Sequence, residues 1–263
     1  MATEPDVIAG VPICRRTAFV LDRFLANQRE IQAAYPKCTL TLATDETDFV
    51  EELREQLRLH SLRGEVITYE TVKPEHARTR LWSITCGREA LRRHVLAKKA
   101  SFFLSFDADM VFAPSVVAIM KSQIAGFDAV FSGYRVPPCG VMVYANGCFL
   151  IKSEVLNDFA FTCWEFGAGD VIDESETVAW GLFKCHAKLN IGTFVFAEHY
   201  WNRESCYAVE PHPTGWFRIL TNKPLFRFML IQTRILVRHN IARELQSLVR
   251  RIPRAREEVD RLG

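Results

Sequence analysis

Two aspartates one residue apart, Asp107 and Asp109, are the residues of this 263-residue sequence most clearly placed for chemistry. They follow the apolar run at 102–106, which is typical of a buried strand in a parallel sheet. Ligands of open α/β sheets bind at the carboxyl ends of strands, where both carboxylates would emerge. Oxygen ligands at this spacing suit a hard cation such as Mg²⁺ or Mn²⁺, which can also bind phosphate. The alternative is a turn with two solvated aspartates.

The elements before the aspartates alternate between predicted strands and helices. Apolar runs predict strands, and apolar residues at helical spacing predict helices. Strands are expected at 7–13, 39–43, 66–69 and 102–106, and helices at 17–34, 48–60 and 79–99. Such alternation predicts a parallel, doubly wound sheet in the first ~110 residues, with the aspartates after its fourth strand.

The next hundred residues have a different pattern, which predicts an antiparallel or mixed sheet. Asn146 and Gly147 form a hairpin-type turn signal between two apolar runs. An irregular stretch at 158–176 is rich in glycine, aromatic and acidic residues. The expected strands are 128–133, 140–144, 148–151 and 189–196, and the expected helices are 115–125 and 177–185.

A basic amphipathic pattern begins at about Leu225, where apolar residues recur at helical spacing between arginines. Its helix could cover the sheet, or it could lie on an anionic membrane surface. Binding to nucleic acid is not expected, because no recognisable binding module accompanies the arginines. We therefore expect a domain at 1–215, with halves of about 1–112 and 113–215, and a helical tail at 216–263.

Composition indicates an ordinary globular protein, with 49% apolar residues, 24% charged residues and a formal charge of +2. The length suits one large α/β domain or one domain with an appendage. Eight scattered cysteines without a CxxC pair, and no signal-peptide pattern at the start, favour a cytoplasmic setting and argue against zinc. No apolar run reaches the ~20 residues that span a bilayer.

The order of these features resembles that of GT-A-fold glycosyltransferases, in particular the family-2-like inverting enzymes. The resemblance covers residues 6–202: an alternating half, a DxD motif after its fourth strand, a mixed half, an acidic loop before a helix, and a late histidine. It implies an α/β fold of GT-A type, with a Rossmann-like nucleotide-binding half, a mixed sheet and the C-terminal tail. The implied activity is hexosyltransferase-like: metal-dependent, inverting transfer from a UDP- or GDP-sugar to an unknown glycan, lipid-linked or small-molecule acceptor.

The resemblance assigns a metal site to Asp107, Asp109 and His199. These residues would hold Mn²⁺ or Mg²⁺ against the donor diphosphate, so that the charge of the leaving nucleotide is stabilised. An imidazole ligand suits Mn²⁺ better than Mg²⁺. The alternative for His199 is a packed or surface residue.

The resemblance also assigns residues to the donor. Those expected to bind it, besides Asp107, are Pro12, Arg15, Asp45 and Arg88. Pro12 and Arg15 would lie against the nucleotide, and Asp45 would contact the base or ribose. The alternatives are a strand terminator for Pro12, a helix N-cap for Asp45 and a solvated helix face for Arg88.

The base that takes the acceptor proton is left open among three carboxylates. The family has a Glu-Asp pair at a helix start, where the helix N-terminus keeps a carboxylate ionised. Here Glu174 matches the glutamate, but Ser175 stands where the aspartate should be. The candidates are therefore Asp173 first, Glu174 second, and Glu176.

The acceptor side would be lined by Asn146, Gly147 and Trp164. An aromatic side chain there could stack on a sugar face. The alternative for Trp164 is a plug in the core.

Two other functions stay open. Residues 106–111 also resemble the nucleophile motif of haloacid-dehalogenase-like phosphatases, with Asp107 as nucleophile, and 169–173 resemble their late acidic motif. The required lysine would be Lys121 or Lys152. Position argues against this, because that strand normally opens the domain and three strand–helix units come first here. The third hypothesis is a non-catalytic nucleotide- or sugar-binding relative.

Overall fold

The computed structural model describes residues 5–72, 80–136, 140–142, 147–165, 171–172 and 174–211. The chain divides into two compact units, Met1–Arg218 and Ile219–Gly263, and every described residue belongs to the first. The predicted tail at 216–263 and its boundary lie outside the described residues. No described helix is long and apolar enough to cross a membrane.

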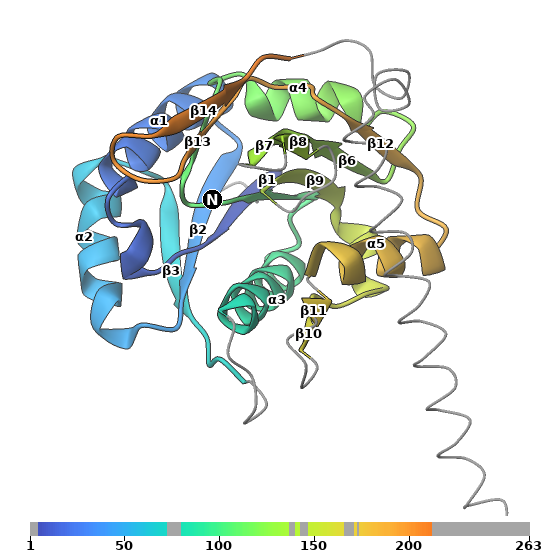
Figure 1. Cartoon of the computed structure of the whole chain (residues 1–263), viewed down its shortest axis with the longest axis horizontal. Helices are drawn as coiled ribbons and strands as arrows, with labels where there is room; N and C mark the ends of the chain where they lie inside the picture. The colour runs from blue at the N-terminus through green and yellow to red at the C-terminus, as the bar shows by residue number, and fades with distance from the viewer. Residues whose placement is uncertain are drawn as a thin grey trace, which may run out of the picture. The chain divides into compact units, whose positions relative to one another are not determined.

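A seven-stranded sheet forms the centre of the first unit (Figure 1). Its strands are β1 (Val7–Pro12), β2 (Cys38–Thr44), β3 (Gly64–Thr68), β4 (Phe102–Phe106), β6 (Ala129–Ser132), β9 (Cys148–Lys152) and β12 (Leu189–Gly192). Their order is β12-β6-β9-β4-β1-β2-β3. The first four strands are parallel, β9 is antiparallel to β4 and β6, and β12 is parallel to β6. A parallel first half and a mixed second half are what the sequence predicts.

Helices cover both faces of this sheet. They are α1 (Leu21–Ala34), α2 (Val50–Leu59), α3 (Leu81–Ala97), α4 (Val116–Gln123) and α5 (Glu174–Lys184), with short 3-10 helices η1 (Arg15–Thr17), η2 (Thr47–Phe49) and η3 (Ser153–Asn157). Apolar residues of α1, α2 and α4 share one core, and those of α3 and α5 share another. Along β1, Val7 and Ala9 face the first core while Ile8 faces the second, as the two-residue period of a strand requires. In Figure 1, α4 lies above the strands and α3 below them.

Smaller sheets complete the unit. They comprise β5 (Met110–Phe112) with β13 (Ala197–Tyr200) and β14 (Cys206–Val209), β7 (Tyr134–Val136) with β8 (Gly140–Met142), and β10 (Trp164–Glu165) with β11 (Val171–Ile172). The chain turns between β4 and β5, where the Met110 N–H donates to the Asp107 carbonyl at 3.2 Å. The sequence patterns predicted neither the pairing of β5 with β13 nor the short strands β7, β10, β11 and β14.

The Asn146-Gly147 hairpin is a correction to the sequence prediction. The strands on either side of it do not pair with each other, because β8 pairs with β7 whereas β9 pairs with β4 and β6. The reason lies in β9, whose first four residues, Cys148 to Ile151, are all buried. Such a strand needs a neighbour on both edges and cover on both faces, which only the central sheet provides.

Candidate functional site

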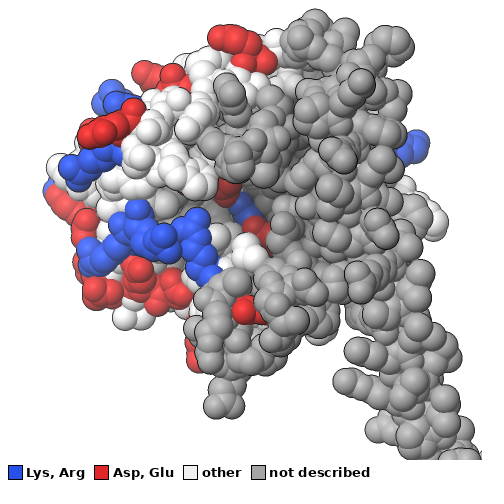
Figure 2. Space-filling view, viewed as in Figure 1, with Lys and Arg blue, Asp and Glu red and all other residues white. Residues whose placement is uncertain are grey.

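A cleft of about 660 Å³ opens at the carboxyl ends of β1 and β4. The chain order reverses between these two strands, and ligands of open α/β sheets bind at such a switch point. Figure 2 shows a hollow on this face with acidic and basic side chains at its bottom. The cleft brings together Pro12, Asp45, Asp107, Asp109, Glu174 and His199 from five separate segments.

Arg88 lies in the floor of the cleft. It comes from α3, its side chain is only 3% exposed, and its guanidinium pairs with Asp107 and Glu174. A buried cation is costly unless partners compensate it, and two carboxylates do so here. Arg88 therefore joins the end of β4 to the start of α5. It is not on a solvated helix face, and its charge is compensated by carboxylates of the protein itself.

Asp107 has protein partners on both carboxylate oxygens. Oδ1 pairs with Arg88, and Oδ2 accepts a hydrogen bond of 3.3 Å from the Tyr134 hydroxyl. Burial raises the pKa of Asp107, and the Arg88 charge opposes that rise. Gly147 closes over this pair: a Cβ there would lie 2.5 Å from the Tyr134 hydroxyl and 2.6 Å from Asp107 Oδ2. Position 147 therefore has no room for a side chain.

Asp109 and His199 face each other across two strands, with 3.7 Å between Oδ1 and Nε2. The pairing of β13 with β5 sets this contact, and the Tyr200 N–H donates to the Asp109 carbonyl at 2.8 Å. Rings of Tyr134 and Trp201 lie edge-on to His199, at centroid distances of 5.5 and 6.1 Å. The structure thus joins two of the three predicted metal ligands and pairs Asp107 with Arg88 instead.

A carboxylate beside an imidazole fits a divalent cation, Mn²⁺ in particular. Within the described ranges, however, no group of three or more His, Cys, Asp or Glu side chains is arranged to hold a metal ion. If a cation binds here, Asp109 and His199 would supply two ligands beside an open cleft. Such a site fits a cation that takes its remaining ligands from phosphate oxygens and water, as Mg²⁺ usually does.

Asp45 lies at another part of the cleft, in a hydrogen-bonded group. Its Oδ2 accepts hydrogen bonds from the hydroxyls of Thr71 and Ser83, the latter at 2.9 Å. The Tyr69 hydroxyl lies 3.1 Å from Ser83 Oγ. The alternative of a helix N-cap does not hold, because the N-cap of η2 is Glu46 and that of α2 is Phe49. The structure therefore presents Asp45 as part of the cleft wall, as Pro12 is.

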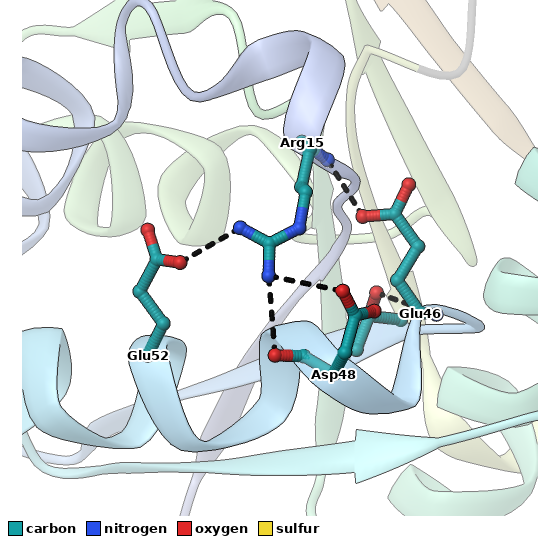
Figure 3. Close-up of polar contacts among 5 residues, drawn as sticks. Arg15, Glu46, Asp48 and Glu52 are labelled. Atoms are coloured by element: carbon teal, nitrogen blue, oxygen red, sulfur yellow. Dashed lines mark hydrogen bonds and ion pairs between the residues drawn. The ribbon is translucent and has the colours of Figure 1, made fainter.

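Arg15 is not among the residues that line the cleft. Its guanidinium donates to Glu52 at 2.8 Å and to the Asp48 carbonyl at 3.1 Å, while its backbone N–H donates to Glu46 (Figure 3). The same guanidinium lies 4.6 Å from the centroid of the Phe49 ring. Arg15 therefore holds the turn after β1 against the start of α2. Its neighbour Arg16 lines the cleft instead, and only its position in the same turn hinted at that.

The base candidates are placed unevenly. Glu174 is buried and paired with Arg88, and its Oε2 has no hydrogen-bond partner among the described residues. Ser175 lines the cleft beside it. Asp173 and the side chain of Glu176 lie outside the described residues.

The predicted acceptor residues are also separated. Gly147 lines the cleft, Asn146 lies outside the described residues, and Trp164 is 44% exposed on β10 without lining the cleft. Trp201 does line the cleft, together with Tyr69 and Tyr134, and the sequence patterns did not single it out. Its only signal was its place two residues after His199.

No protein-family model and no curated protein sequence matches the chain. Among solved structures it is similar to the mannosyltransferase PcManGT from Pyrobaculum calidifontis in complex with GDP-Man and Mn²⁺, with a TM-score of 0.50 and 18% identity over 72% of this chain. It also matches S. aureus TarS 1-349 in complex with UDP-GlcNAc, with a TM-score of 0.48 and 14% identity over 80% of the chain.

A third similar structure is glucosyl-3-phosphoglycerate synthase from Mycobacterium tuberculosis in complex with Mg²⁺ and UDP, with a TM-score of 0.45 and 14% identity over 74% of this chain. The chain spans 55%, 59% and 72% of the lengths of these three proteins. At identities this low, the similarity is evidence for a shared fold and not for a shared activity. The mannosyltransferase match and the strand order agree with the fold expected from the sequence, and the chain has the GT-A fold.

Proposed function

We propose that this protein is a metal-dependent glycosyltransferase that moves a sugar from a UDP- or GDP-sugar to a hydroxyl of a glycan, lipid-linked or small-molecule acceptor. The observation that carries the proposal is the Asp109–His199 pair, 3.7 Å apart in a cleft at the switch point of the sheet. The similar mannosyltransferase structure, which contains GDP-Man and Mn²⁺, supports the proposal.

Asp109 and His199 would hold Mn²⁺ or Mg²⁺ at the diphosphate. When bound there, the cation neutralises the charge that develops on the leaving nucleotide. At the other part of the cleft, Asp45 would accept a hydrogen bond from an N–H of the base or from a hydroxyl of the ribose. Arg88 would keep Asp107 and Glu174 in position from below, rather than bind the donor itself.

The transfer would proceed with inversion. The acceptor oxygen forms a bond to the anomeric carbon, the bond from that carbon to the diphosphate breaks, and a carboxylate takes the acceptor proton. Asp173, Glu174 and Glu176 remain the candidates for that carboxylate. Because Glu174 is buried against Arg88, we favour Asp173 and Glu176 as bases and a positioning role for Glu174.

The phosphatase hypothesis finds little support in the geometry. Its nucleophile would be Asp107, whose two oxygens already have partners. Its lysine would be Lys121 or Lys152, but Lys121 pairs with Asp6 and Lys152 pairs with Asp128. A cytoplasmic location and contact of residues 216–263 with a membrane surface stay predictions.

The test is a thermal-shift series on the full chain with UDP, GDP, CDP and dTDP, with and without Mn²⁺. A ligand that binds only the native state stabilises it by about 2.7 kcal/mol at a hundredfold excess over its Kd. We expect one nucleotide to raise the Tm only with Mn²⁺, and Mn²⁺ alone to have little effect because the protein supplies two ligands. Asp109→Asn should abolish the shift without lowering the Tm of the free protein. No shift with any nucleotide would contradict the proposal.

A further inference from the structure

Trp201 is exposed inside a cleft, which is unusual for so large an apolar side chain. Among the described residues, the exposed large apolar side chains are Leu59, Val72, Trp164 and Trp201, and Trp201 is the one that lines the cleft. Its exposed fraction is 59%. Apolar surface that is open at a concave site is typical of ligand contact.

The chain presents the Trp201 ring in a defined way. Trp201 comes directly after β13 and, like His199, lines the cleft, whereas the Tyr200 side chain lies outside it. There the Arg23 guanidinium lies 4.7 Å from the Tyr200 ring centroid. The His199 and Trp201 rings meet edge to face at 82°.

The loop after Trp201 is held by its own hydrogen bonds. The Trp201 N–H donates to the Ser205 carbonyl at 3.0 Å. Asn202 Oδ1 accepts from the N–H groups of Glu204 and Ser205, at 2.9 and 2.8 Å. The backbone that carries the ring is therefore already ordered, and ordering it costs nothing further when a ligand packs on the ring.

The surroundings of Trp201 favour one kind of ligand. A flat ring with a negative face attracts the slightly positive C–H groups on the apolar face of a pyranose. Ser175, whose hydroxyl could bind a sugar hydroxyl, lines the same cleft. A phosphate would need the cation or arginines, but no indole.

A nucleobase could also stack on an aromatic ring, but the topology favours a sugar. Asp45, the residue expected at the base or ribose, follows β2, which lies two strands from β4. Trp201 follows β13, which pairs with β5 just beyond β4. With the base at Asp45 and the diphosphate at Asp109 and His199, Trp201 would lie beside the diphosphate, to which the sugar is attached, because its ring is 6.1 Å from that of His199.

We propose that Trp201 is a stacking platform for a pyranose ring at the sugar end of the cleft. The assignment of that end rests on the proposed function. The ring is either the transferred sugar of the donor or a sugar of the acceptor, and the two sources can be separated by experiment.

The donor arm compares the affinities of GDP with GDP-mannose and of UDP with UDP-GlcNAc, by calorimetry on the full chain with Mn²⁺. Trp201→Ala should lower the affinity for the sugar nucleotides about 3- to 10-fold, which is the usual size of an aromatic contact. The affinity for the free nucleoside diphosphates should not change. Trp201→Phe should retain most of the affinity. Trp164→Ala is the matched control, because that indole is exposed outside the cleft, and it should change nothing.

The acceptor arm follows methyl α-mannoside and methyl β-N-acetylglucosaminide by saturation-transfer NMR, with and without Mn²⁺ and nucleoside diphosphate. A signal lost in Trp201→Ala assigns the platform to an acceptor sugar, and a loss confined to the donor arm assigns it to the transferred sugar. An equal loss for free and sugar-bearing nucleotides would mean base stacking and overturn the proposal, as would no loss in either arm. Failure of the wild type to bind any nucleotide rejects the proposed function, while the glycosides without nucleotide still decide on the platform.

Discussion

Arg15 and Arg88 each bridge two carboxylates from other parts of the chain, but they do so in opposite surroundings. The Arg15 side chain is 46% exposed, and its partners Asp48 and Glu52 are also open to water. Arg88 is 3% exposed and meets Asp107 and Glu174 under the cleft. Water and salt screen the ion pairs of Arg15 and compete for its groups. Arg88 is buried, so water cannot replace a carboxylate partner that is lost. The same residue type thus holds the turn after β1 against α2 at the surface, and it joins two buried carboxylates in the floor of the cleft.

The largest effect should come from Arg88→Ala. It leaves the carboxylates of Asp107 and Glu174 without their shared cation, and breaking a buried pair typically costs about 3–5 kcal/mol. Denaturant unfolding of the full chain measures this. The free energy of unfolding of Arg88→Lys should lie between those of the wild type and Arg88→Ala. A lysine keeps the charge, but its ammonium group cannot form the planar fork of a guanidinium. Arg93→Ala is the control, since Arg93 is exposed on the same helix and pairs with Glu89. Equal free energies of unfolding for Arg88→Ala and Arg93→Ala would contradict the proposed difference between buried and exposed arginines.

An intermediate effect is expected from Gly147→Ala. The added methyl group would lie 2.5 Å from Tyr134 and 2.6 Å from Asp107, and overpacking of this kind typically costs about 1–3 kcal/mol. Because Asp107 moves with Tyr134, nucleotide affinity in the presence of Mn²⁺ should fall as well. Denaturant unfolding and calorimetry measure the two losses. If Gly147→Ala kept both the wild-type stability and the wild-type nucleotide affinity, Tyr134 and Asp107 could move aside without cost, and the prediction would be wrong.

The smallest effect is expected from Arg15→Ala. Its network is open to solvent, so the Tm should change little, and the change should shrink further at high salt. Nucleotide affinity should stay at the wild-type level, because Arg15 points to α2 rather than into the cleft. Arg54→Ala is the matched control, since the ion pair of Arg54 lies within α2, with Glu51. A tenfold loss of affinity in Arg15→Ala alone would restore the donor-binding role that the resemblance implies.

The alternating half of the fold could be read from the sequence because its signals are local. The strands β1 and β4 are apolar runs, β2 and β3 carry short apolar stretches, and each helix between them has its own periodicity. The aspartates after β4 could be placed for the same reason, since a strand end is visible in the sequence itself.

The contacts within the site could not be read in this way, because they depend on distant partners. Arg88 stands among Arg92 and Arg93, and only the orientation of α3 decides that Arg88 is buried. Trp164 and Trp201 are both aromatic residues in irregular stretches. Which of them lines the cleft follows from the pairing of β13 with β5, for which no local pattern exists.

That pairing has a consequence for how the protein folds. β13 lies far along the chain from β5, and contacts between distant segments form slowly because a long loop must close first. The neighbouring strands and helices of the first half have shorter loops to close. During refolding we expect the helical circular-dichroism signal to return before His199 reaches Asp109. The cleft would then be the last part of the domain to mature, and recovery of ligand binding would lag behind recovery of secondary structure.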